Sequence, residues 1–351
     1  MNTESFEIDF INVDSGEKSG DAITFRYGDF ADPMKQNVIV IDGGALKTVE
    51  ILVEHIKNRY GTTYVDLVVC THPDGDHASG LRVVLKELNV GKLWVHRPWE
   101  HSEAIRDLFQ DGRLTDNSLS EKLRNAYAFA HELEEIAIEK GIKIEEPFEG
   151  QIFGYGEIRV LGPSKDFYRE LIPDFVRSPE AKESVFSRAF GVVKEAVTNW
   201  VDETFEIETL DESGETSAEN NSSAVLLVTL NDRRYLFTGD SGIPALKNVI
   251  DYARSCEIDL SQLTWLQAPH HGSRRNVSPS VLNEIKAPVV FISAAADSEK
   301  HPSKKVVNAF IRRGSRVFST EGKNIWHQRN APTRPDYGPI ESLPFNYKVP
   351  E

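Results

Sequence analysis

The strongest constraint on this chain is the stretch of residues 71–80, which reads Thr-His-Pro-Asp-Gly-Asp-His-Ala-Ser-Gly. It places two histidines and two aspartates, His72, Asp74, Asp76 and His77, within six positions. Imidazole and carboxylate are the ligand groups of zinc and of neighbouring divalent metals. Four such groups exceed what one closed site usually takes from so short a loop. The stretch therefore predicts two metals, with His72 and Asp74 on one and Asp76 and His77 on the other.

The sequence on either side of this stretch supports a metal-binding interpretation. An apolar run at 65–70 precedes it and an amphipathic run at 81–88 follows it, which predicts a buried strand, a metal loop and a helix. The alternative is coincidence, because the chain has 10 histidines and Pro-Asp-Gly-Asp is by itself an ordinary turn sequence.

Length and composition describe a globular protein without membrane segments. The 351 residues suffice for one large α/β domain or two modest ones, and the apolar fraction is 40%. No apolar run approaches the roughly 18 residues of a membrane helix, and the first residues lack a basic signal region. Cys70 and Cys256 lie far apart and are expected to be reduced, which predicts a cytoplasmic location.

The charge distribution limits the substrates that the chain can bind tightly. Its net charge of −15 argues against tight, nonspecific binding of nucleic acid. Residues 261–330 nevertheless carry 11 Lys and Arg against 4 Asp and Glu, whereas acids dominate 131–220. The basic segment is either a local basic face or a set of solvated helix surfaces.

Strand and helix patterns occur twice along the chain. The first half shows a hairpin over 6–27 with a turn at 14–20, a strand at 37–41 and a helix at 47–60. The second half shows a hairpin over 224–237 and then alternates helices and strands. These are expected at 243–253, 263–268, 288–292, 302–313 and, as the last strand, 316–318. Two such halves predict two sheets packed face to face with helices outside.

Polar, glycine-rich loops follow several of these strands, at 42–44, 71–77, 238–240 and 270–272. In α/β proteins ligands bind at such strand ends. Between the halves lie a long helical pattern at 119–140 and an acidic segment at 202–219, which is expected to be a surface insertion or a mobile loop.

Three motifs in a fixed order resemble the metallo-β-lactamase superfamily. They are residues 71–77, then Phe-Thr-Gly-Asp at 237–240, then Pro-His-His-Gly-Ser at 269–273. More narrowly, the chain resembles the soluble C-terminal hydrolase domain of ComEC-type DNA-uptake (competence) proteins, which typically has His-x-Asp-x-Asp-His in the first motif. The Asn/Ser-rich stretch at 220–223 and His-Pro-Ser at 301–303 match as well. The resemblance covers about residues 6–325.

This resemblance implies an α/β fold, specifically a four-layer αββα sandwich with a dinuclear site between its two sheets. We expect one domain over 1–330, with helical insertions at about 100–148 and 164–219, and a C-terminal surface tail at 331–351. The implied cofactors are two divalent metal ions, Zn or Mn.

The resemblance also implies a role for each motif residue. His72 and Asp74 would serve metal 1, and Asp76, His77 and His271 would serve metal 2. Asp240 would bridge the two ions. His270 is the alternative ligand or a hydrogen-bonding partner. Asp76 would also orient the attacking water, and His301 would steady the leaving group or a phosphate oxygen.

The chain departs from the family pattern at metal 1. The superfamily's third histidine for this metal is absent, and Asn221 and Ser222 occupy that region. Metal 1 is therefore expected to bind weakly. Asp74 in place of a histidine shifts the preference from zinc toward manganese. The candidates for substrate binding are Arg274, Arg275, Asn221, Ser222 and His96.

The favoured function is metal-dependent hydrolysis of phosphodiester bonds, in a nucleic acid or a nucleotide. One alternative is a hydrolase of another ester, a lactone or an amide, because an activated water attacks acyl carbon as readily. A second alternative is a non-catalytic metal-binding partner protein. Neither a membrane nor a particular protein partner is indicated.

Overall fold

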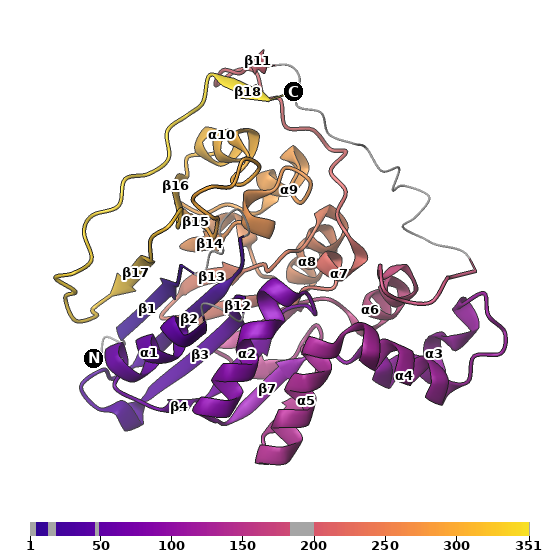
Figure 1. The fold of residues 1–351 in the computed structure, drawn as a ribbon. Helices are drawn as coiled ribbons and strands as arrows, with labels where there is room; N and C mark the ends of the chain where they lie inside the picture. The colour runs from indigo at the N-terminus through magenta and orange to yellow at the C-terminus, as the bar shows by residue number, and fades with distance from the viewer. Residues whose placement is uncertain (1–4, 13–18, 46–48, 183–199, 351) are drawn as a thin grey trace.

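A computed structural model describes residues 5–12, 19–45, 49–182 and 200–350. Two seven-stranded sheets form its centre, with helices against their outer faces (Figure 1). This arrangement confirms the predicted αββα sandwich. The turn expected at 14–20 and the second insertion fall partly outside the described residues, at 14–18 and 183–199.

The first sheet has the strand order β17-β1-β2-β3-β5-β7-β8. Its strands are β1 (Ser5–Phe10), β2 (Ala22–Gly28), β3 (Gln36–Gly43), β5 (Leu67–Cys70), β7 (Lys92–Val95), β8 (Lys143–Glu145) and β17 (Ile325–Arg329). The second sheet has the order β16-β15-β14-β13-β12-β10-β9. Its strands are β9 (Ile152–Phe153), β10 (Ile158–Gly162), β12 (Val225–Leu230), β13 (Arg233–Phe237), β14 (Trp265–Gln267), β15 (Val289–Ile292) and β16 (Arg316–Ser319).

Helices and short strand pairs complete the described structure. The α-helices are α1 (Val49–Arg59), α2 (Gly75–Glu87), α3 (Ser102–Ile105), α4 (Asp116–Ala126), α5 (Ala128–Lys140), α6 (Lys165–Leu171), α7 (Ala218–Asn221), α8 (Ile243–Ser255), α9 (Pro279–Glu284) and α10 (Lys304–Arg312). The 3-10 turns are η1 (Pro33–Lys35), η2 (Pro98–His101), η3 (Arg106–Leu108), η4 (Ile172–Asp174), η5 (Leu260–Gln262) and η6 (His270–Gly272). β4 (Tyr64–Val65) pairs with β6 (Asn89–Val90), and β11 (Trp200–Asp202) pairs with β18 (Lys348–Pro350). None of the described helices is both long and apolar enough to span a lipid bilayer.

The central strands are buried on both faces, which explains why they read as unbroken apolar runs. In β3, Val38 and Val40 pack under the helices, whereas Ile39 and Ile41 pack between the sheets. A separate apolar cluster lies between the second sheet and α8, α9 and α10. Three apolar layers therefore separate the four layers of the sandwich.

Three expected elements differ from the structure. The helix expected over 119–140 is divided into α4 and α5 at Tyr127, whose hydroxyl donates a hydrogen bond to Glu219. α2 begins at Gly75, so Asp76 and His77 lie in its first turn. The strand at 316–318 is not the last, because β17 returns to pair antiparallel with β1.

A buried ion network attaches the C-terminal segment to the first sheet. Both carboxylates of β1, Glu7 and Asp9, are fully buried. Arg334 binds Asp9 and lies 2.9 Å from Glu7, and Tyr60 donates to Asp9 over 2.6 Å. Burial raises the pKa of Asp9, but the charges of His55 and Arg334 hold it at about 2, below its usual 3.8.

The acidic segment expected to be a surface insertion or a mobile loop packs against the basic one. Arg312 of α10 lies 3.0 Å from Glu203, and Arg313 lies 2.7 Å from Glu208. Arg312 also donates to three backbone carbonyls between residues 204 and 207. These two arginines therefore contribute to the fold and add little to any basic surface.

We expect the substitution Arg334→Met to lower the free energy of unfolding by about 3 kcal/mol at pH 7, because it removes the cation that two buried carboxylates share. Glu7 keeps its contact with Arg26, and Asp9 keeps its contact with His55. Urea unfolding measures this difference. Asp9 has a depressed pKa, so its stabilisation is complete above about pH 4 and is lost as the pH falls toward about 2. The two proteins should therefore converge in stability on acidification.

The control for this experiment is Lys323→Met, in the exposed turn before β17. It should leave the stability at pH 7 unchanged. Equal stability of Arg334→Met and the wild type would show that the network does not hold the C-terminal segment.

Candidate metal centre

The predicted ligands meet where strands of both sheets end. The loops that carry them follow β5 in the first sheet and β13 and β14 in the second. A hydrogen bond of 2.7 Å from Gln267, at the end of β14, to Asp21, just before β2, joins the two sheets at this point. The centre is thus built between the sheets by loops whose positions depend on both halves of the chain.

Asp240 lies at the middle of the cluster. Its Oδ2 is 3.5 Å from Nε2 of His77, 3.6 Å from Nε2 of His270 and 3.8 Å from Nε2 of His72. Two ligands that each lie about 2.1 Å from one ion at a tetrahedral angle are about 3.4 Å apart. These separations are slightly longer than the spacing of ligands that share an ion, and they make Asp240 the common neighbour of three histidines.

Asp42 determines which nitrogen of two histidines can bind a metal. His77 Nδ1 donates to Asp42 Oδ2 over 2.8 Å. The hydroxyl of Thr71 donates to the same oxygen over 2.6 Å, so it accepts from Nδ1 of His72, 3.1 Å away. In both rings the proton is therefore on Nδ1 and the lone pair on Nε2, which is the tautomer that a metal needs.

The two histidines of the last motif are oriented in the same way. His271 Nδ1 donates to the carbonyl of Ser293 over 2.9 Å. Asn276 donates its amide to the Asp240 carbonyl, so its Oδ1 accepts from His270 Nδ1 at 2.9 Å. Nε2 is consequently the free nitrogen of His72, His77 and His271. At His270 the contact of Nδ1 with Asn276 is shorter than its contact with the Asn220 amide nitrogen, which favours the same tautomer.

Several buried atoms at this point have no hydrogen-bond partner among the described residues. They are Nε2 of His72, His77 and His271, and Oδ1 of Asp21 and Asp240. A buried polar atom without a partner costs about 1–3 kcal/mol. Five converging lone pairs with no donor between them are what a divalent cation satisfies, and the residues present therefore fit a metal centre.

The ligand atoms form overlapping groups. Asp76, His77 and His271 offer atoms within 4.8 Å of one another, and so do Asp21, His77 and Asp240. The first group consists of the three residues that were expected to bind metal 2. The expected bridging residue, Asp240, belongs to the second group. On the other side, His72 lies 3.7 Å from Asp74, whose side chain is 43% exposed. These residues, with His270, are the ones that would hold a pair of ions.

The charges of the cluster shift two pKa values in opposite directions. Burial raises the pKa of Asp240, but His270, His77 and His271 lower it well below its usual value. Burial lowers the pKa of His77, but Asp240 and Asp42 raise it well above 6.5. Without a metal, His77 therefore holds a proton beside Asp240, which means that metal and proton compete for the same nitrogen.

Close backbone packing brings α2 to Asp42. A Cβ on Gly80 would collide with the Gly43 carbonyl, and a Cβ on Gly43 would collide with the backbone of Leu81. Asp42 itself has a φ of 56°, which turns the chain as β3 ends. Gly43, in the glycine-rich loop predicted at 42–44, therefore allows the helix that carries His77 to approach the strand.

His301 lies beside the cluster. Its ring centroid is 5.7 Å from that of His270 and 6.2 Å from that of His271. Burial and these two histidines lower the pKa of His301 to about 3. It is therefore a neutral hydrogen-bonding group at physiological pH.

The Asn/Ser-rich stretch contacts the centre one residue earlier than expected. Asn220 places its amide nitrogen 3.2 Å from Nδ1 of His270 and 2.7 Å from the Thr216 hydroxyl. Asn221 and Ser222 are buried and donate to the backbone of α7 and its cap. No described histidine takes the place of the missing third ligand of metal 1 in this stretch.

The remaining candidates for substrate binding lie in two different environments. Arg274 is half-buried, and its charge lowers the pKa of Asp211. The backbone of Arg275 packs against Gly214, and its side chain is exposed. His96 is 3% exposed, and its ring stacks on Tyr168 at 4.5 Å.

Two buried aspartates of the centre, Asp21 and Asp42, are not among the predicted ligands. Asp21 lies in the hairpin expected over 6–27, and Asp42 begins the polar loop at 42–44, one of the strand ends where ligands are expected. Both lie where a strand begins or ends. A carboxylate in such a position is the sequence signal that could have identified them as residues of the site. Their role depends on contacts with Gln267 and His77, which lie far away in the sequence.

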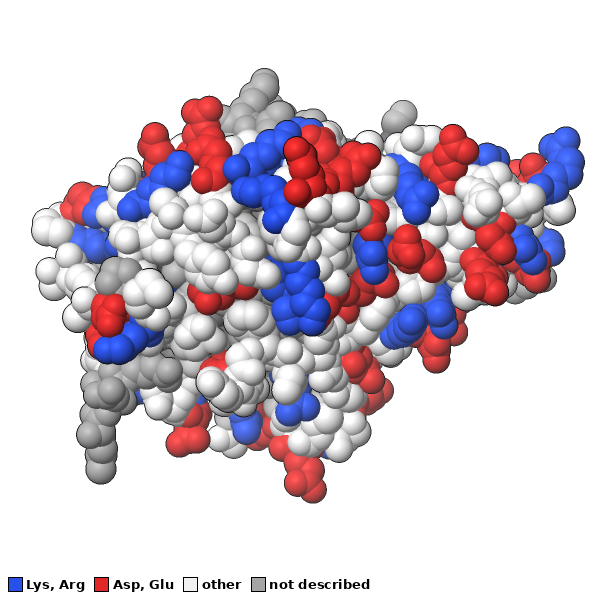
Figure 2. Space-filling view, turned by 90° about the horizontal axis from the view of Figure 1, so that it is seen from below, with Lys and Arg blue, Asp and Glu red and all other residues white. Residues whose placement is uncertain are grey.

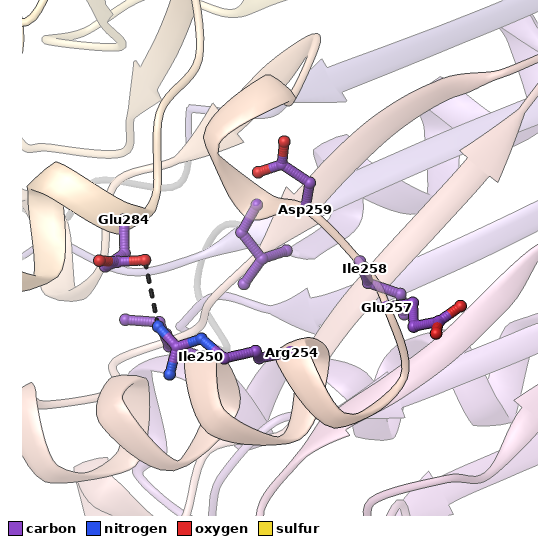
Figure 3. Close-up of a pocket in the computed structure, with 7 residues that line it drawn as sticks. Ile250, Arg254, Glu257, Ile258, Asp259 and Glu284 are labelled. Carbon is purple, nitrogen blue, oxygen red and sulfur yellow. Dashed lines mark hydrogen bonds and ion pairs between the residues drawn. The ribbon is translucent and has the colours of Figure 1, made fainter.

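A separate hollow of about 280 Å³ lies at the far end of α8, between α8 and α9 (Figure 3). Asp240 precedes the beginning of α8, which is about 20 Å long, so the hollow is remote from the metal centre. Three of its four charged lining residues have partners: Arg254 binds Glu284 at 3.3 Å, and Asp259 accepts from the hydroxyl of Ser261.

We expect Asp42→Asn to weaken metal binding by roughly 10- to 100-fold, because the amide no longer fixes both histidines with Nε2 free. Titration of the metal-free protein against a chromophoric chelator measures the affinity. Asp66→Asn is the matched control, since Asp66 accepts a backbone hydrogen bond at the start of the same strand. Unchanged affinity in Asp42→Asn would show that Asp42 does not orient the ligands.

Comparison with known proteins gives this geometry a family. The sequence profile of the metallo-beta-lactamase superfamily matches residues 35–295, well over half of the chain. No curated protein matches the chain.

Solved structures with a similar fold include three proteins of different description. A mutant metallo-beta-lactamase from Cronobacter sakazakii is 11% identical, covers 74% of this chain and 78% of its own, and has a TM-score of 0.32. A mutant of the CmlA beta-hydroxylase is 9% identical; the match covers 94% of this chain and 54% of the hydroxylase chain, with a TM-score of 0.48. A diphosphatase of the PhnP family is 10% identical; the match covers 93% of this chain and 99% of the diphosphatase chain, with a TM-score of 0.40.

At these identities the likeness of the solved structures concerns the fold alone, and the profile carries the assignment. The matched residues include the motif that supplies His72 and His77, together with Asp240 and His271. This chain belongs to the metallo-beta-lactamase superfamily.

Proposed function

We propose that this protein is a metal-dependent hydrolase of phosphodiester bonds, with two divalent ions, Zn or Mn, as its cofactors. The observation that carries the proposal is the set of buried, unpartnered atoms of His72, His77, His271, Asp21 and Asp240, most of which belong to overlapping groups of possible metal ligands. Bound metals would acidify a water molecule and polarise the bond to be cleaved. The protein's own residues would bind the substrate and position it.

The composition of the centre favours phosphate over an acyl substrate. Four carboxylates, Asp21, Asp74, Asp76 and Asp240, lie among the candidate ligands. Carboxylate ligands make a site hard, and hard cations pair with phosphoryl oxygens. The resemblance of the motifs to the hydrolase domain of ComEC-type proteins supports the same substrate class.

Several side chains would act on the substrate directly. Asp76, in the first turn of α2, would orient the attacking water. His301, as a neutral imidazole beside His270, would donate a hydrogen bond to a phosphate oxygen. Arg274 follows the His-His-Gly loop and would neutralise part of the charge of the phosphate.

The surface favours a substrate of nucleotide size over a long nucleic acid. On the face shown in Figure 2, Lys and Arg are interleaved with Asp and Glu, and no continuous basic area forms. The net charge is −15, and Arg312 and Arg313 are paired with Glu203 and Glu208. A long polyanion needs a row of phosphate contacts, which the face in Figure 2 does not offer.

We expect the protein loaded with Mn²⁺ or Zn²⁺ to hydrolyse bis-p-nitrophenyl phosphate, and chelation to abolish the activity. Asp240→Asn and Asp76→Asn should each lower kcat/KM by at least roughly 100-fold, since each removes a ligand of the centre. Release of p-nitrophenolate measures the rate. Cyclic nucleotides, dinucleotides, single-stranded DNA and RNA then define the substrate.

Asp259→Asn, which removes a carboxylate at the remote hollow, serves as the control and should retain full activity. A metal-replete wild type that cleaves no phosphodiester but cleaves a carboxylic ester or a lactone would overturn the proposal in favour of acyl hydrolysis. A protein that binds metal and cleaves none of these would favour a non-catalytic role.

A further inference from the structure

Phe129 is a partly exposed aromatic side chain beside the loop that carries the first ligands. Its ring lies against Gly75, and a Cβ on Gly75 would stand 3.1 Å from Cε2 of the ring. Gly75 is bonded to Asp74 and Asp76, two candidate ligands that are themselves partly exposed. Phe129 is 38% exposed. An aromatic ring therefore borders the accessible side of the metal centre, within one residue of two ligands.

The helix that carries Phe129 is attached at both ends. α5 lies beside α2 (Figure 1), and Lys140 at the end of α5 donates over 2.6 Å to the carbonyl of Leu85, near the end of α2. Just before α5 begins, Tyr127 donates over 2.8 Å to Glu219. The beginnings of the two helices therefore meet at the metal loop. A ring that is fixed in this way is preorganised for binding.

Arg82 of α2 packs on the same ring. Its guanidinium lies 5.0 Å from the ring centroid, within the range of a cation–π contact. Arg82 also binds Glu132, and its Nε donates over 3.0 Å to the carbonyl of Ser79. Because the charge of Arg82 is paired with that of Glu132, the surface at the ring suits a flat, uncharged group better than a phosphate.

A nucleobase has the chemistry that this surface accepts. Nucleobases are flat, aromatic and uncharged at neutral pH, and proteins bind them by stacking on phenylalanine rings and on arginine planes. In a nucleotide one sugar separates the base from the phosphate. A base that stacks on Phe129 therefore belongs to a phosphate held at the ligands on either side of Gly75. The residues proposed to act on the phosphate leave this part of the substrate unassigned.

We infer that Phe129 stacks on the base of a nucleotide substrate whose phosphodiester bond is cleaved at the metal centre, an inference that rests on the proposed function. It narrows the substrate class to nucleotide esters, which the protein would bind through the ring face and not by hydrogen bonds to the base edge. Since every base has a stacking face, different nucleotides should be accepted to a similar degree. Phe129 determines specificity and takes no part in the chemical step.

Two esters with the same leaving group test this role. The p-nitrophenyl ester of thymidine monophosphate carries a base, and the p-nitrophenyl ester of abasic deoxyribose phosphate lacks it. Phe129→Leu keeps an apolar contact with Gly75 but loses the aromatic face. In the metal-loaded protein it should raise KM for the thymidine ester roughly tenfold and leave kcat unchanged. For the abasic ester both constants should stay as in the wild type, and Phe129→Trp should restore the wild-type KM for the thymidine ester.

A calorimetric readout is independent of turnover. The Kd of thymidine monophosphate for the zinc-loaded protein should rise roughly tenfold in Phe129→Leu and return in Phe129→Trp. The Kd of methyl phosphate should be the same in all three proteins. Tyr155→Leu removes a fully exposed aromatic ring in the turn between β9 and β10 and is the matched control, which should alter none of these constants. Metal content and melting temperature should match those of the wild type throughout.

Three outcomes would overturn the inference alone. Equal rises in KM for both esters would show that the ring supports the metal loop and binds no base. Unchanged binding of thymidine monophosphate in Phe129→Leu would show that the base lies elsewhere. A Phe129→Trp protein as weak as Phe129→Leu would rule out stacking. Failure of the metal-loaded wild type to cleave either ester would instead overturn the proposed function, and this inference with it.

Discussion

The centre of this protein depends on one carboxylate that is not itself in the middle of the ligands. Asp42 accepts hydrogen bonds from His77 and from Thr71, and through Thr71 it also orients His72. It can do so only because β3 ends in a left-handed residue and because two glycines let α2 lie against that end. The tautomers of two ligands, the start of a helix and the end of a strand are therefore one coupled arrangement, and a change in any of them is transmitted to the others.

The two sides of the centre are supplied differently. Asp76, His77 and His271 lie close together and come from two motifs that the sequence displays. The side of His72 lacks the third histidine of the family, but His270 and His72 each lie within 3.8 Å of Asp240, whereas Asp21 lies with His77 on the other side. A metal at the side of His72 would therefore have the carboxylates of Asp74 and Asp240 beside two imidazoles, which is consistent with a harder ion.

The strands of the fold and two central residues, His72 and His77, could be predicted from the sequence because their signals are local. Continuous apolar runs identify strands buried on both faces, and the spacing within 71–77 identifies His72 and His77. Asp21 and Asp42 could not be found in this way, since an aspartate beside a glycine is as typical of a turn as of a site. Their importance comes from Gln267 and His77, which only the folded chain brings to them. The basic segment was ambiguous for the same reason, because its neutralising acids Glu203 and Glu208 lie about a hundred residues away.

The helical insertion shows how such a distant contact can override a local pattern. The periodicity over 119–140 favours one continuous helix, and breaking a helix forfeits backbone hydrogen bonds. The break occurs at Tyr127, whose ring is 2% exposed and whose hydroxyl binds Glu219. Burying this ring and satisfying its hydroxyl offsets the lost hydrogen bonds. The helical region of α4 and α5 is thereby attached to the segment that also contacts His270 and Asp240.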